Sequence, residues 1–145
     1  MQYLVEQGTL DELSEIEQQI PEFDNPKSKD TIVARLQNRR SLLLVAKVDG
    51  KPVAYKLGYE KSTQHFYSWL GAVIPEYRGS GIAQSLLNEQ ERWCLEQGYE
   101  FISVKSMNKF KSMLMMLLKN NYHIVACNPV NGGTDSKIKF LKQFE

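Results

Sequence analysis

A glycine-rich turn between an apolar run and a helical pattern is the feature that most constrains how this chain can fold. Residues 66–74 are mostly apolar and end at Pro75, and apolar side chains recur with helical spacing over residues 82–95. Gly79 and Gly81 lie between them, and glycine lets the backbone approach a ligand without a Cβ in the way. The free N–H groups and the dipole of the following helix favour an anion there. The pattern therefore predicts a strand, an anion-binding loop for a phosphate or pyrophosphate, and a helix; the alternative is an ordinary strand-to-helix turn.

Two common phosphate-binding loops do not fit this stretch. A Walker A loop needs a glycine, four residues and then Gly-Lys-Ser/Thr, and no lysine follows Gly81. The dinucleotide-binding fingerprint Gly-x-Gly-x-x-Gly fails at Gln84, which stands where the third glycine is required. The pattern that the chain does contain is Arg-x-x-Gly-x-Ala, at Arg78, Gly81 and Ala83.

The remaining elements follow from hydrophobic periodicity and turn residues. Thr9 and Glu12 form a capping box before an apolar helical pattern, and Asp-Gly at residues 49–50 separates two strand-like runs as in a β-hairpin. Asn108 is placed to cap a helix. The predicted helices are 10–20, 29–38, 82–95 and one after residue 108; the predicted strands are 1–7, 41–48, 51–59, 65–74, 101–104, 122–127 and 136–144, with loops at 22–30 and 128–135.

Length and composition limit the function classes. The 145 residues suit one domain with one core, so residues 1–145 are predicted to form a single domain. A net charge of +1 provides no strong field for nucleic acid or an acidic membrane surface. The two cysteines and two histidines give neither a disulfide framework nor a metal-type spacing, and Cys94 is expected to be a buried thiol. Without a secretory or membrane-spanning pattern, we expect a cytoplasmic protein with no metal, no nucleic-acid partner and no membrane partner, either a monomer or a homodimer.

The stretch from Val73 to Ala83 closely resembles the coenzyme A pyrophosphate loop of the GNAT acyltransferase superfamily, whose signature is Arg/Gln-x-x-Gly-x-Gly/Ala. The order of predicted elements is also similar to that fold. The resemblance implies an α+β (three-layer α/β) architecture, the GNAT acyl-CoA N-acyltransferase fold, with a mixed central sheet and helices on both faces. It also implies that the strand before the loop splays from its parallel neighbour, so that the pantetheine arm lies in the gap.

The same resemblance implies acetyl-CoA as the cosubstrate. The loop N–H groups would hold its pyrophosphate, with the Ser80 hydroxyl as an extra donor and Arg78 as an added charge; a plain surface arginine is the alternative for Arg78. Asn108 matches the family asparagine that bonds the pantetheine arm, a role compatible with capping a helix. The implied cofactor-binding residues are Ala72, Val73, Ile74, Arg78, Gly79, Ser80, Gly81, Ile82, Ala83, Gln84 and Asn108.

The chain departs from the family pattern at two catalytic positions. In the family, a tyrosine acts as the general acid. Its position lies five residues before Tyr122, the second residue of the Asn121-Tyr122 pair, and here it holds Leu117, which cannot donate a proton. The position of a strand glutamate base holds Ser68. Ser68, as the anchor of a water chain, and Glu22, in the loop between the first two helices, are the catalytic candidates; a solvated loop carboxylate is the alternative for Glu22.

These features predict transfer of an acetyl group from acetyl-CoA to an amine of a small molecule or protein, by direct attack in a ternary complex. Holding the amine against the thioester could supply roughly 7 to 11 kcal/mol. The alternative is an acyl-CoA-binding sensor or interaction module without catalysis, which the missing tyrosine and carboxylate motivate.

Overall fold

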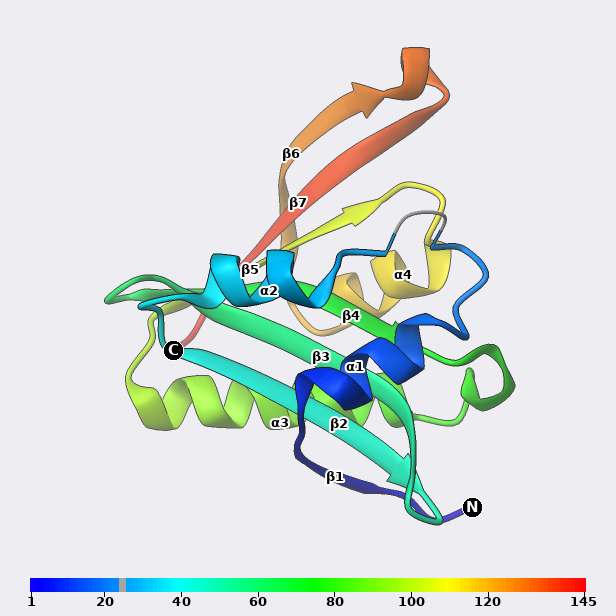
Figure 1. The fold of residues 1–145 in the computed structure, drawn as a ribbon. Helices are drawn as coiled ribbons and strands as arrows, with labels where there is room; N and C mark the ends of the chain where they lie inside the picture. The colour runs from blue at the N-terminus through cyan, green and yellow to red at the C-terminus, as the bar shows by residue number, and fades with distance from the viewer. Residues whose placement is uncertain (24–25) are drawn as a thin grey trace.

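The computed structural model describes residues 1–23 and 26–145, and its elements follow the predicted order (Figure 1). Part of the predicted loop over residues 22–30 therefore lies outside the described residues. The strands are β1 (Leu4–Gln7), β2 (Ser41–Val48), β3 (Lys51–Ser62), β4 (His65–Val73), β5 (Phe101–Met107), β6 (His123–Val130) and β7 (Asp135–Gln143). The helices are α1 (Leu10–Glu17), α2 (Lys29–Leu36), α3 (Ile82–Gln97) and α4 (Lys111–Lys119), with single turns η1 (Pro75–Tyr77) and η2 (Asn131–Gly133).

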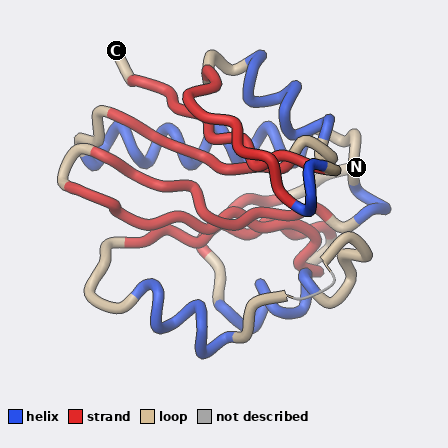
Figure 2. Tube along the Cα trace, turned by 90° about the horizontal axis from the view of Figure 1, so that it is seen from above, coloured by secondary structure: helices blue, strands red, loops and turns tan. Residues whose placement is uncertain are grey.

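The strands form one mixed sheet in the order β1-β2-β3-β4-β5-β7-β6. Only β4 and β5 pair in parallel, because α3 connects them by a crossover, while the other pairs are antiparallel. Helices α1 and α2 cover one face of the sheet and α3 and α4 the other, as the view from above shows (Figure 2). This arrangement confirms the predicted fold class.

Local sequence signals explain the first half of the chain. The capping box is formed, since the Glu12 N–H donates to Thr9 Oγ1 at 3.3 Å and the Thr9 N–H donates to the Glu12 carboxylate at 2.9 Å. Asp49 and Gly50 take φ angles of 51° and 80°, as a two-residue turn of the predicted hairpin requires. Leu13 and Ile16 of α1 are fully buried in the core. Buried side chains from both faces of β2 and β3 belong to the same core.

A β-bulge in β4 opens the sheet beside the loop. Leu57 of β3 pairs with Leu70 and Gly58 pairs with Ser68, so Trp69 is the extra residue on β4. The parallel pairing of β4 with β5 covers only His65–Ser68 and ends at the bulge. Beyond it β4 continues along β3 while β5 continues along β7, and the two strands diverge (Figure 1). The splay that the family resemblance implied is therefore present between residues 69–73 and 105–107.

Two local predictions are wrong in the second half of the chain. Asn108 does not cap a helix, because its N–H donates to Ser136 O at 2.9 Å and extends the β5–β7 ladder; α4 begins only at Lys111, after Phe110. Residues 128–130 are not loop but the end of β6, which pairs with β7 up to Val130. Pro129 obscured this strand in the sequence, yet proline is tolerated there because β6 lies at the sheet edge.

Candidate active site

The loop that follows β4 is open and has the backbone geometry of an anion site. Gly79 and Gly81 take φ angles of 76° and 88°, in the left-handed region that favours glycine, and a Cβ placed on either would meet nothing within 4 Å. Gly81 is the N-cap of α3, which is 16 residues long. The first hydrogen bond of the helix runs from Ser85 N–H to Gly81 O at 3.1 Å.

The N–H groups of residues 79–84 have no hydrogen-bond acceptor among the described residues. They lie at the positive end of the helix dipole, so together they can bind an anion of the size of a pyrophosphate. The backbone geometry of the loop thus fits the pyrophosphate that its sequence predicted. The side chain of Ser80 has a partner within the loop, because its hydroxyl donates to Tyr77 O.

The backbone of β4 offers hydrogen-bonding groups to the splay. Ile74 N–H donates to Val53 O at 2.9 Å, so Ile74 faces β3. Because the backbone groups of successive strand residues alternate in direction, Ala72 also faces β3, while Val73 and Gly71 turn their groups toward the splay. Of the three residues predicted to contact pantetheine, Val73 is the one so directed, and Gly71 joins it.

Arg78 clamps the end of β4 to the segment after α1. Its Nε donates to Val73 O at 3.0 Å, and its two terminal nitrogens donate to the Glu22 carboxylate at 2.6 and 3.1 Å. The hydrogen bonds from this guanidinium lower the pKa of Glu22. The structure therefore brings together two predicted site residues that are 56 positions apart in the sequence.

Helix α4 is joined to the loop helix by a reciprocal pair of side-chain amides. Gln84 Nε2 donates to Asn120 Oδ1 and Asn120 Nδ2 donates to Gln84 Oε1, both at 2.9 Å. Asn108 lies apart from this pair on an exposed turn, where its Oδ1 accepts a hydrogen bond from Lys111 Nζ at 3.3 Å. The binding role of Asn108 stays a prediction.

Comparison with known proteins decides the family. The model of the acetyltransferase (GNAT) family matches residues 10–112, which is most of the chain and includes the whole loop. The chain belongs to the GNAT acetyltransferase family. A search of curated proteins gave no sequence match.

Solved structures of GNAT proteins share the fold. The ribosomal-protein-S18-alanine N-acetyltransferase from Escherichia coli superposes with a TM-score of 0.84 at 17% identity, over 98% of this chain and 94% of that chain. A GNAT family acetyltransferase from Elizabethkingia anophelis, with acetyl-CoA bound, superposes with a TM-score of 0.74 at 15% identity, over 98% of each chain. The yncA protein from Salmonella typhimurium, with its cofactor acetyl-CoA, gives 0.76 at 13% identity, over 99% of this chain and 94% of that chain.

The two departures of this GNAT protein from the family pattern remain in the structure. Leu117 is fully buried and has no proton to donate. Asn121 takes a left-handed φ of 69°, and the hydroxyl of Tyr122 donates to the Glu91 carboxylate at 2.6 Å. Ser68 is buried at the point where β4 and β5 separate. Its role as a water anchor stays a prediction.

Other potentially reactive groups are remote from the loop or inert. His65 and Glu60 lie at the β3–β4 turn, whereas Val73 pairs with Ala54 at the other end of the hairpin. Cys94 is fully buried, and burial raises the pKa of its thiol to about 12, so it is no nucleophile. The described residues contain no group of three metal-ligating side chains, and none of their helices is long and apolar enough to cross a membrane.

Proposed function

We propose that this GNAT protein is an acetyl-CoA-dependent N-acetyltransferase that acetylates an amine of a small molecule or protein. The observation that carries the proposal is the open loop at the N-terminus of α3, next to a strand that parts from its parallel neighbour. The acetyl-CoA in two structures of the same fold supports this choice of cosubstrate.

In this proposal, the main task of the chain is to bind and orient acetyl-CoA and the acceptor amine, rather than to transfer protons. The N–H groups of residues 79–84 hold the pyrophosphate, and the backbone of Gly71 and Val73 holds the pantetheine amides. The acceptor amine attacks the thioester carbonyl, a C–N bond forms, and the C–S bond breaks to release the thiolate of coenzyme A. A backbone N–H of β4 at the splay polarises the carbonyl as its oxygen gains charge. Positioning supplies most of the rate, because the thioester is already activated.

Proton transfer in this scheme is assigned to water. The amine must lose a proton to become nucleophilic, and the proton leaves through water anchored at the splay, where Ser68 lies. The leaving thiolate needs no strong acid, because a thiol has a pKa of about 8.5 and its thiolate is therefore a comparatively weak base.

Glu22→Gln is expected to lower kcat/KM by less than about fivefold, because an exposed ion pair contributes about 0 to 1 kcal/mol. The Arg78 guanidinium already lowers the pKa of Glu22, which makes this carboxylate a weak base. The acid limb of the pH profile of kcat/KM should therefore stay in place. Glu76→Gln, which changes an exposed carboxylate in η1, is the matched control. A hundredfold loss together with disappearance of the acid limb in Glu22→Gln alone would instead make Glu22 the general base.

The direct test mixes the purified protein with acetyl-CoA and a panel of amines, and follows thiol release together with the mass of the acceptor. The panel contains free amino acids, polyamines and short peptides with a free N-terminus. Transfer to any of them, with a matching rise in mass, is the expected result. Binding of acetyl-CoA without turnover across the panel would favour an acyl-CoA sensor or interaction module. Failure to bind coenzyme A would reject both functions.

A further inference from the structure

Cationic side chains gather over aromatic rings on the sheet face that α1 and α2 cover, opposite the face that carries α3. The Arg35 guanidinium lies 4.7 Å from the centre of the Trp69 ring, and its Nη1 donates to the Tyr59 hydroxyl at 3.3 Å. The Arg39 guanidinium lies 4.9 Å from the centre of the Tyr59 ring. Two lysines share a third ring, since Lys61 Nζ and Lys105 Nζ lie 5.3 and 5.6 Å from the centre of Tyr67. The buried rings of Tyr59 and Tyr67 thus form the floor under these cations.

Two further lysines extend this charge along β7. Lys139 is the cross-strand partner of Lys105, and Lys137 lies two residues on, on the same side of β7. Like charges directly opposite in a sheet are destabilising, so this pairing costs stability. Burial and the neighbouring cations, first Lys61, then Lys137, Lys139 and Arg35, lower the pKa of Lys105.

The cations of this surface have no carboxylate partner among the described residues. The salt bridges of residues 1–23 and 26–145 involve other cations: Lys29, Lys47, Arg78, Arg92 and Lys142. Asp135 lies two residues before Lys137, on the same face of β7. Its carboxylate accepts a hydrogen bond from Ser136 N–H at 2.8 Å. We call Arg35, Arg39, Lys61, Lys105, Lys137 and Lys139 the basic face.

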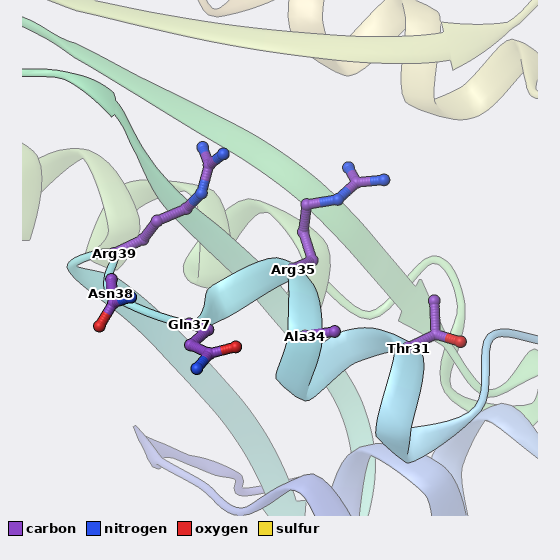
Figure 3. A pocket seen from close by; sticks show the side chains of 6 residues that line it. All are labelled: Thr31, Ala34, Arg35, Gln37, Asn38 and Arg39. Atoms are coloured by element: carbon purple, nitrogen blue, oxygen red, sulfur yellow. The ribbon is translucent and has the colours of Figure 1, made fainter.

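The basic face adjoins the point where transfer would occur. Trp69, under Arg35, is the bulge residue at which β4 leaves β5, and Lys105 is the first β5 residue beyond the parallel pairing. A shallow hollow beside α2 continues the surface; it is lined by Thr31, Ala34, Arg35, Gln37, Asn38 and Arg39. In Figure 3 the two arginines point in the same direction, across the strands and away from Asn38 and Gln37. The coenzyme loop leads into α3, which covers the opposite face of the sheet. This side of the splay is therefore left for the acceptor.

We propose that the basic face selects an acceptor whose amine lies close to carboxylates, and that Arg35 and Lys105 bind those carboxylates. The inference rests on the proposed function, because it names the acceptor of the same transfer reaction. Unneutralised cations held on a rigid aromatic floor bind an anion without first breaking an internal ion pair. A free acidic amino acid and an acidic peptide share the required chemistry, and the test separates them.

The test measures kcat/KM for the peptide Ala-Glu-Asp-Glu, its neutral counterpart Ala-Gln-Asn-Gln, and free glutamate against glutamine. We expect the acidic peptide to exceed the neutral peptide by about tenfold or more, with the difference shrinking as salt is raised. An advantage of glutamate over glutamine would assign the site to small acceptors. An advantage confined to the peptides would assign it to acidic chains.

Variants then tie the preference to the basic face. Arg35→Gln should remove most of the advantage of the acidic peptide while leaving kcat/KM for the neutral peptide and the KM for acetyl-CoA unchanged. Arg35→Lys should keep part of it, because the charge remains. Arg40→Gln is the matched control, since Arg40 donates to Gln97 of α3 instead of facing these rings.

Three outcomes would overturn the proposal. The first is equal or better use of the neutral peptide, and the second is an Arg35→Gln variant that loses both peptides equally. The third is tighter binding of a single-stranded oligothymidylate than of the acidic peptide, which would make the surface a nucleic-acid site. If no amine is acetylated, the proposed function fails, but this result does not decide whether the basic face recognises carboxylates. Quenching of tryptophan fluorescence by the two peptides then still measures whether the carboxylates are recognised.

Discussion

Gly81→Asp is expected to weaken acetyl-CoA binding by at least about 100-fold. The substitution places a carboxylate at the N-cap of α3, in the open space where the free N–H groups of residues 79–84 converge. Two like charges about 4 Å apart repel by about 4 kcal/mol at an effective dielectric constant of about 20, so a bound pyrophosphate would be expelled. Aspartate tolerates the left-handed conformation better than most residues, which keeps the fold intact. Isothermal titration with acetyl-CoA measures the loss.

Gly98→Asp is the matched control for this prediction. Gly98 caps the other end of the same helix with a φ of 87°, and a Cβ there also meets nothing within 4 Å. The backbone strain and the added charge are therefore equal, while the distance from the loop differs by the length of α3. We expect Gly98→Asp to unfold at a lower temperature, because a carboxylate opposes the dipole at a helix C-terminus, and to bind acetyl-CoA as the wild type does. Wild-type affinity in Gly81→Asp would show that the coenzyme binds elsewhere.

The parts of the site that could be predicted from the sequence depend on short-range rules. The glycine loop and the β2–β3 hairpin each need a left-handed backbone at a fixed place, and glycine or Asp-Gly marks that place. The order of elements followed for the same reason, because capping and turn residues mark most boundaries. The error at Asn108 shows the limit of this logic. An asparagine before an apolar helical run satisfies the capping rule, yet pairing with β7, a strand distant in sequence, decided its conformation.

The remainder of the site depends on contacts between distant segments. Nothing in the local sequence pairs Glu22 with Arg78, and Trp69 becomes a bulge residue only through the register of β3 and β4. The basic face has the same origin. Its cations come from α2, the segment after α2, β3, β5 and β7, and a net charge of +1 conceals them, because the compensating carboxylates lie elsewhere. The sequence signal that could have exposed it is the repeated lysine of β7 together with Lys105, read as one sheet face.

A buried lysine beneath the splay was also invisible in the sequence pattern. Lys56 of β3 is only 5% exposed and pairs across the sheet with Leu44 on one side and Gly71 on the other. Its ammonium has no salt-bridge partner among the described residues. Burial lowers the pKa of this amine to about 8, and the charge of Glu91 opposes the shift only in part.

Lys56→Met is therefore expected to stabilise the protein at pH 7 by about 3 kcal/mol, because one pKa unit corresponds to about 1.4 kcal/mol and the pKa of Lys56 falls from 10.5 to about 8. Between these two pH values the unfolded chain binds a proton that the folded protein lacks, so the free energy of unfolding of the wild type rises with pH across this window. Below the folded pKa the penalty is constant.

Urea unfolding at pH 7 and pH 9.5 measures this dependence directly. The advantage of Lys56→Met should shrink by about 2 kcal/mol over that interval, since the wild type loses its buried charge while the variant has none. Lys51→Met, at the exposed start of the same strand, removes a lysine that is not buried and is the matched control. A constant difference between wild type and Lys56→Met at both pH values would mean that Lys56 stays charged in the fold. In that case a water or an acidic neighbour must solvate the ammonium beneath the splay, where the coenzyme arm is proposed to lie.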